Sequence, residues 1–202
     1  MNENYDKLLQ LLIDKNFENN IVPNLMLHSC CAPCSSYVID YLSNYFNITV
    51  IYYNPNIFPF SEYIRRKEEQ IRLINDMNVK YKVNIIDCDY DNDLYEEAIK
   101  GLEFEPERGN RCTICFKMRL EKTVKFAKEG NFDYFATTLT LSPYKNAKLI
   151  NKIGLDLEQQ YGIKYLASDF KKRDGYKKSI ELSKLYNLYR QDYCGCKYSK
   201  KK

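Results

Sequence analysis

The stretch Leu25-Met-Leu-His-Ser-Cys-Cys-Ala-Pro-Cys-Ser-Ser-Tyr37 predicts a strand, a short turn and a helix, with three thiols in the turn. The apolar run Ile21 to Leu27 precedes the cysteines, and an amphipathic pattern from Tyr37 to Phe46 follows them. Ligands of open α/β proteins bind at the carboxyl ends of the strands, which is where this turn falls. Adjacent cysteines do not readily form a disulfide with each other. We therefore interpret three thiols as candidate metal ligands: Cys30, Cys31 and Cys34.

Strands and helices alternate along the rest of the chain. Runs of β-branched and aromatic residues predict further strands at 47–53, 81–86, 132–137 and 164–167. Helical periodicity predicts helices at 5–17, 60–78, 94–99, 112–128, 147–161 and 174–190. This alternation predicts a three-layer α/β/α fold with a parallel sheet, whose right-handed crossovers bring all strand ends to one edge. We expect a single domain over residues 1–202, with a disordered lysine-rich tail at 197–202.

The composition is that of a soluble globular protein. Of the 202 residues, 45% are hydrophobic and 29% charged, and the net charge of +4 permits an anionic partner without requiring one. No apolar run approaches the roughly 20 residues of a membrane helix, and the start Met-Asn-Glu-Asn-Tyr-Asp lacks the features of a signal peptide. We expect a cytoplasmic protein without a membrane partner. In that reducing compartment, eight cysteines indicate metal binding or redox catalysis.

Seven of the eight cysteines fall into three groups. The groups are Cys30-Cys31-Ala-Pro-Cys34, Arg111-Cys112-Thr-Ile-Cys115-Phe, and Tyr193-Cys194-Gly-Cys196. Two Cys-x-x-Cys pairs supply four soft anionic ligands, which suit zinc or an iron–sulfur cluster. A closed structural zinc site would leave three of these thiols unexplained, whereas Cys88 alone is typical of a core residue.

The third group permits two interpretations. A disulfide between Cys194 and Cys196 would be strained and easily reduced, which suits a redox pair that opens and closes. The alternative is a second metal pocket formed with Cys34.

Five segments of the chain resemble the epoxyqueuosine reductase family QueH, in the order of that family. They are His28-Ser-Cys-Cys-Ala-Pro-Cys34, Glu62-Tyr-Ile-Arg-Arg-Lys67, Arg111-Cys-Thr-Ile-Cys-Phe-Lys-Met-Arg-Leu120, Leu141-Ser-Pro-Tyr-Lys-Asn146 and Tyr189-Arg-Gln-Asp-Tyr-Cys-Gly-Cys196. The resemblance implies a nucleotide-hydrolase-like (HUP) α/β core. It also implies the last step of queuosine synthesis, in which an epoxide on a modified base of the tRNA anticodon loop is reduced to the alkene.

The resemblance further implies roles for individual residues. It assigns Cys30, Cys31, Cys112 and Cys115 to a 4Fe–4S cluster, and Cys194 and Cys196 to a redox-active pair. A further mononuclear iron beside the cluster is implied as well, with Cys34, Cys194 and Cys196 as candidate ligands. The reaction needs two electrons and two protons, so the implied partners are a tRNA carrying epoxyqueuosine and an external electron donor.

Basic and loop residues supply the remaining candidates. Near the site, cations that could bind RNA are Arg65, Arg66, Lys67, Lys171, Lys172 and Arg173. Loops at the predicted active edge carry Tyr144, Lys145 and Asp169. The only histidine, His28, is expected to be a packed residue at the end of a strand rather than a ligand.

Two other functions compete with the reductase. An ATP-using tRNA sulfur-transfer enzyme of the same fold would need a glycine-rich phosphate loop, and residues 29–35 contain no glycine. A zinc-stabilised RNA-binding module would explain the basic charge and one Cys-x-x-Cys set. It would be colourless, whereas an iron–sulfur protein is brown.

Overall fold

Five parallel strands form one sheet in the computed structural model, which describes residues 4–199. The strand order is β3-β2-β1-β4-β5, and the central strand β1 pairs Leu27 with Val50 on one side and with Ala136 on the other. The strands are β1 (Asn24–His28), β2 (Asn47–Ile51), β3 (Asn84–Ile86), β4 (Tyr134–Thr137) and β5 (Lys164–Tyr165). The predicted parallel sheet is confirmed.

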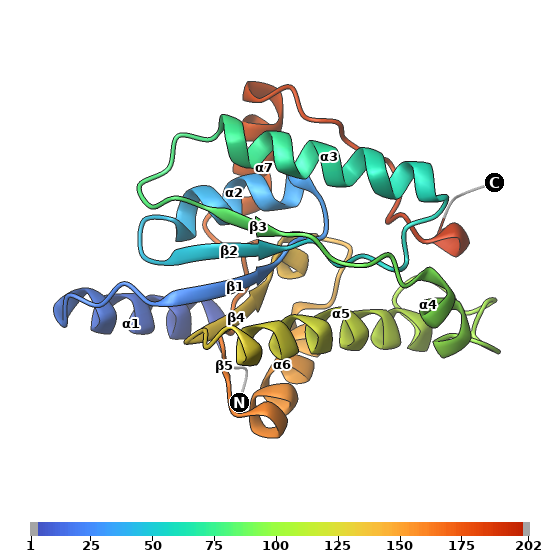
Figure 1. The fold of residues 1–202 in the computed structure, drawn as a ribbon, viewed down its shortest axis with the longest axis horizontal. Helices are drawn as coiled ribbons and strands as arrows, with labels where there is room; N and C mark the ends of the chain where they lie inside the picture. Colours follow the sequence, from blue (N-terminus) through green and yellow to red (C-terminus); the bar gives the residue numbers. More distant parts are fainter. Residues whose placement is uncertain (1–3, 200–202) are drawn as a thin grey trace.

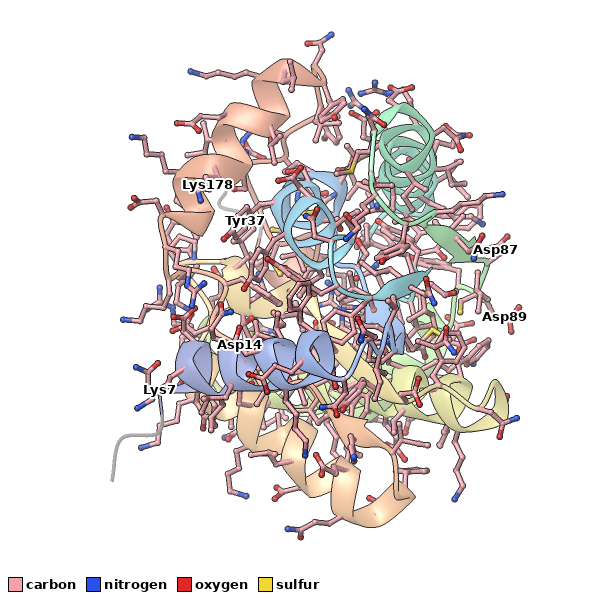
Figure 2. All side chains as sticks on the ribbon, turned by 90° about the vertical axis from the view of Figure 1, so that its left-hand side faces the viewer. Lys7, Asp14, Tyr37, Asp87, Asp89 and Lys178 are labelled. Atoms are coloured by element: carbon pink, nitrogen blue, oxygen red, sulfur yellow. The ribbon has the colours of Figure 1, made fainter. Side chains whose placement is uncertain are left out.

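Helices cover both faces of the sheet, as the predicted three-layer fold requires (Figure 1). One face carries α2 (Ala32–Leu42), α3 (Phe60–Asp76) and α7 (Gly175–Leu185); the other carries α5 (Asn110–Glu129) and α6 (Ala147–Tyr161). The remaining elements are α1 (Tyr5–Glu18), α4 (Asn92–Ala98) and the 3₁₀ turns η1 (Thr138–Leu141) and η2 (Lys197–Ser199). Figure 2 shows α7 lying against α2, where the Lys178 ammonium is 5.5 Å from the centre of the Tyr37 ring.

Strand β1 is the centre of the hydrophobic core. Leu25 and Leu27 belong to the cluster beneath α2, whereas Met26 points to the opposite cluster with Leu120 and Val124 of α5. All three β1 side chains are completely buried. A strand buried on both faces is apolar on both, which is why Leu25 to Leu27 shows no alternation.

The direction of winding reverses between β1 and β4, which are neighbours in the sheet. From β1 the chain passes through α2 to β2 on one side, whereas β4 passes through α6 to β5 on the other. The segments that follow β1 and β4 therefore flank a crevice at the carboxyl ends of the strands. In Figure 1 the first turns of α3 and α5 and the turn η2 lie at this same end of the sheet.

Some element boundaries differ from those predicted. Helix α2 begins at Ala32, not after the cysteines, because Pro33 in its first turn favours a helix start. Helix α7 ends at Leu185, since Arg72 of α3 binds the carbonyl oxygens of Tyr186 and Asn187. Of the tail expected to be disordered, residues 197–199 form η2, and residues 200–202 lie outside the described part of the chain. No helix within residues 4–199 is long and apolar enough to cross a membrane.

Candidate metal centre

The thiols of the first group converge at the carboxyl end of β1. The sulfur atoms of Cys30, Cys31 and Cys34 all lie within 4.8 Å of one another. Cys31 caps the N-terminus of α2, and Cys34 lies in the first turn of that helix, which brings its side chain back to the strand end. Thr138, which follows β4, donates its hydroxyl to Cys30 Sγ at 3.4 Å and accepts a bond from Cys30 N at 3.1 Å. Both sides of the crevice thus contribute to this site.

The three thiols of this group differ in pKa. Hydrogen bonds from Cys31 and Cys34 hold the pKa of the Cys30 thiol well below its usual range, despite burial. The hydrogen bond to Cys30 raises the pKa of Cys31 to about 12, and that of Cys34 is also raised by its bonds to the other two sulfurs. Cys30 is therefore the thiol of this group that loses its proton most readily. A metal binds the deprotonated form of cysteine, so its binding here would release protons.

The second and third thiol groups line a common pocket. Cys112 and Cys115 come from the start of α5, and Cys194 and Cys196 come from the turn that precedes η2. Burial raises the pKa of Cys112, and it raises that of Cys115 to about 12. The backbone N–H of Arg108 donates to Cys112 Sγ at 3.3 Å. Four further thiols therefore face one cavity.

Two cations connect the pocket with the first thiol group. Arg119 of α5 is 2% exposed, and it donates to Cys115 Sγ at 3.7 Å and to the Asn54 side chain. Burial would lower the pKa of Arg119, but the nearby Cys115, Cys194 and Cys30 raise it. Half-buried Lys145 also has a raised pKa, because Cys194, Cys30 and Cys34 outweigh the effect of its burial. Cysteines of all three groups therefore act on Arg119, and cysteines of the first and third groups act on Lys145.

A polar side chain in this pocket indicates that it accommodates another chemical group. Asn56 is 1% exposed and lines the pocket, yet neither atom of its amide has a hydrogen-bond partner among the described residues. Buried amides are rarely left unpaired in folded proteins. Soft thiol ligands, two cations and a free amide donor fit an anionic, sulfur-ligated metal group.

His28 and the basic residues expected near the site have defined surroundings. His28 is packed at the strand end as predicted, bound to Thr137 Oγ1 at 2.9 Å and to the Tyr53 carbonyl at 3.1 Å. The expectation for Arg66 is wrong, because this side chain is 2% exposed and cannot be an RNA-facing surface charge. Lys67 and Arg173 are engaged in ion pairs with Asp87 and Asp6.

The other loop candidates also have defined surroundings. Lys171 binds Asp169 at 2.9 Å and the Thr140 carbonyl at 2.9 Å, so these residues join the segments that follow β4 and β5. Tyr144 lines the pocket and is 62% exposed. Cys88 is half-buried and lies apart from the three groups, beside Lys122 and several aspartates. All eight cysteines are free thiols, including Cys194 and Cys196.

Three residues of this site were missed by sequence reasoning. No motif assigned a role to Asn56, Arg119 or Thr138. Thr138 contacts Cys30 from a distant segment, whereas Arg119 lies one helical turn from Cys115, and Asn56 is placed only by the pocket that it lines. Only the position of Thr138 directly after a predicted strand could have suggested it.

Comparison with known proteins identifies the family of this chain. The profile of the family described as "Epoxyqueuosine reductase QueH" matches residues 25–202. A protein of that name from Staphylococcus epidermidis is 47% identical over 97% of this chain and 84% of its own length. Namesakes from Streptococcus pyogenes serotype M1 and Thermotoga maritima are 44% and 34% identical, over 98% and 87% of this chain and 78% and 89% of their own lengths. The chain therefore belongs to the epoxyqueuosine reductase QueH family.

Proposed function

We propose that this protein is an epoxyqueuosine reductase, which reduces epoxyqueuosine in the anticodon loop of a tRNA to queuosine. The observation that carries the proposal is the convergence of three thiol groups around Arg119 and Lys145 in a chain of the QueH family. Neither a zinc-stabilised module nor a sulfur-transfer enzyme requires seven thiols at one strand edge.

We assign four cysteines to a 4Fe–4S cluster: Cys30, Cys31, Cys112 and Cys115. Arg119 lies close to both Cys115 and Cys30, which supports ligands drawn from both segments. Three thiols of the groups then remain: Cys34, Cys194 and Cys196. Either all three hold an adjacent iron, or Cys194 and Cys196 act as a thiol–disulfide pair. When bound, the metal group supplies the electrons of the reaction one at a time, from an external donor.

The residues around the pocket hold the oxygen that leaves. Reduction of an epoxide to an alkene consumes two electrons and two protons, and the oxygen leaves as water. The Lys145 ammonium at the pocket wall donates a hydrogen bond to the epoxide oxygen while that oxygen gains negative charge. Burial strengthens this interaction, because water competes less for it.

An exposed aromatic residue at the pocket suits an unpaired RNA base. Tyr144 lines the pocket and is 62% exposed. Proteins recognise bases of single-stranded loops by stacking them on such rings. We therefore propose that Tyr144 stacks on a base of the anticodon loop, next to the epoxide-bearing nucleotide.

The test is a direct assay of the anaerobically purified protein. It is incubated with tRNA carrying epoxyqueuosine and a low-potential one-electron reductant, and the digested nucleosides are quantified by mass spectrometry. The wild type should form queuosine, Cys194→Ser should lose nearly all activity, and Cys88→Ser should retain it. A colourless protein with one bound zinc ion and no queuosine formed would contradict the proposal, as would a normal rate for Cys194→Ser.

A further inference from the structure

Arg66 is a buried cation that neither RNA binding nor the thiol ligands explain. Its side chain lies on α3 and is 2% exposed. The Nε atom donates to Glu62 Oε1 at 2.7 Å, and Nη1 donates to the backbone carbonyl of Cys194 at 3.3 Å. The third nitrogen, Nη2, has no hydrogen-bond partner within residues 4–199. Burying a guanidinium is costly, so its placement beneath the Cys194–Gly195–Cys196 turn requires an explanation.

The backbone of this turn lies directly against the guanidinium. Gly195 has a φ of +105°, a conformation that other residues rarely adopt. A Cβ atom at this position would also lie 2.9 Å from Arg66 Nη1 and 2.9 Å from Ile57 Cγ1. The carbonyl that follows Cys194 O in the turn is Gly195 O, and it accepts a hydrogen bond from Phe58 N at 2.9 Å. Two successive carbonyls of the turn are thus bonded to the protein body.

Arg66 also adjoins the first thiol group. Burial would lower its pKa, but the bond to Glu62 and the nearby Cys31 raise it. Its guanidinium carbon lies 5.0 Å from the centre of the Tyr193 ring, which precedes the turn. Glu62 in turn accepts a hydrogen bond from Tyr189 Oη at 3.0 Å. One buried cation on α3 therefore contacts the C-terminal segment before and within the turn.

We propose that Arg66 is the positioning residue of the Cys194–Gly195–Cys196 turn. Anchored by Glu62, its guanidinium binds the Cys194 carbonyl and keeps both thiols of the turn in the pocket that Cys112 and Cys115 line. Glycine is favoured at position 195 by its φ of +105°, and it also lets the guanidinium approach the turn closely, because a Cβ atom would lie only 2.9 Å from Arg66 Nη1. The inference deepens the proposed function at the same site, but its test does not depend on epoxide reduction.

The test measures the reactivity of individual thiols in the full-length, anaerobically purified protein. Arg66→Lys keeps the charge but loses the fixed fork of the guanidinium. After mild reduction, the alkylation rate of each cysteine by iodoacetamide is followed by peptide mass spectrometry. Loss of one charge-assisted hydrogen bond should make Cys194 and Cys196 react about tenfold faster. Rates at Cys112, Cys115 and Cys88 should remain unchanged.

A neighbouring arginine provides the matched control. Arg65 is exposed, and its guanidinium lies on the Tyr189 ring at 3.6 Å, so Arg65→Lys should leave all alkylation rates unchanged. If Arg66→Lys fails to fold, Glu62→Gln weakens the anchor and should increase the same two rates to a smaller degree. Unchanged rates at Cys194 and Cys196, or an equal increase at Cys88, would overturn the proposal. Because no substrate is used, a failure of the proposed reductase activity leaves this test intact.

Discussion

Arg119 donates a hydrogen bond to the sulfur of Cys115 at 3.7 Å, from one turn further along α5. The same guanidinium binds the Asn54 side chain, and its pKa is raised by Cys115, Cys194 and Cys30. A fully buried cation is costly unless negative charge compensates it. Arg119 and the thiol groups therefore depend on each other electrostatically.

The charge of Arg119 should affect the potential of the bound metal group. In Arg119→Gln we expect a more negative reduction potential, because a nearby positive charge and a hydrogen bond to a ligand sulfur both favour the added electron. An anaerobic potentiometric titration monitored by visible absorbance measures this shift. Lys117→Gln, an exposed position on the same helix, is the control and should leave the potential unchanged. An unaltered potential in Arg119→Gln would contradict the electrostatic role.

Removal of one thiol from the first group should strongly weaken metal binding. We expect Cys31→Ser to lose most of its iron and its visible absorbance, because the hydroxyl is a poor substitute for a thiolate ligand. Iron per chain and the absorbance spectrum of the anaerobically purified protein test this. Cys88→Ser should retain both, since Cys88 lies outside the three groups. Wild-type iron content in Cys31→Ser would exclude this residue as a ligand.

The unpaired amide of Asn56 leads to a prediction with opposite signs in two states. In the metal-free protein, Asn56→Leu should raise the free energy of unfolding by about 1 kcal/mol, because it removes an unsatisfied buried amide. In the iron-loaded protein the same change should lower stability, since the amide would lose its partner.

Chemical denaturation of both forms distinguishes these effects. Asn151→Leu is the control, because the Asn151 amide is also buried but is bonded to Ala147 O, Ser168 O and Ser168 N. That variant should be destabilised in both states. Equal effects of Asn56→Leu with and without iron would show that its amide does not face the metal group.

Glu69 should make part of the stability dependent on pH. Hydrogen bonds from Arg72, and then from Tyr189 N at 2.6 Å, hold the pKa of this carboxyl below its usual value of 4.5. A lowered pKa in the folded state stabilises the protein above pH 4.5, and this stability is lost as the pH falls through the folded-state pKa.

The loss in Glu69→Gln should therefore be larger at neutral pH than in acid. We expect about 1 kcal/mol at pH 7, since the Arg72 side chain is 41% exposed and solvent screens the pair. Urea unfolding at pH 7 and at pH 3.5 measures the difference. Glu68→Gln, at an exposed neighbouring position, should show almost no loss at either pH. A loss in Glu69→Gln that is independent of pH would rule out the carboxylate as its cause.

Periodicity and local chemistry were sufficient to predict the elements and their order. The continuous apolar run before Cys30 marks a strand buried on both faces, and the alternation with helices predicts the parallel sheet that the structure contains. Short edge strands were less well defined: β3 covers only Asn84–Ile86 of the predicted 81–86. Such strands have one neighbour or little burial, so their sequences carry a weaker pattern.

The sequence by itself determined which thiols are grouped, because ligands within one turn or one Cys-x-x-Cys pair are near each other for local reasons. It also determined that the first group lies at a strand end. Only the tertiary structure decided which other side chains surround these thiols. Arg119, Lys145 and Asn56 reach the site from three different segments, and Arg66 was misjudged as a surface charge. Burial and long-range hydrogen bonds depend on how helices pack on the sheet, and no local pattern encodes that packing.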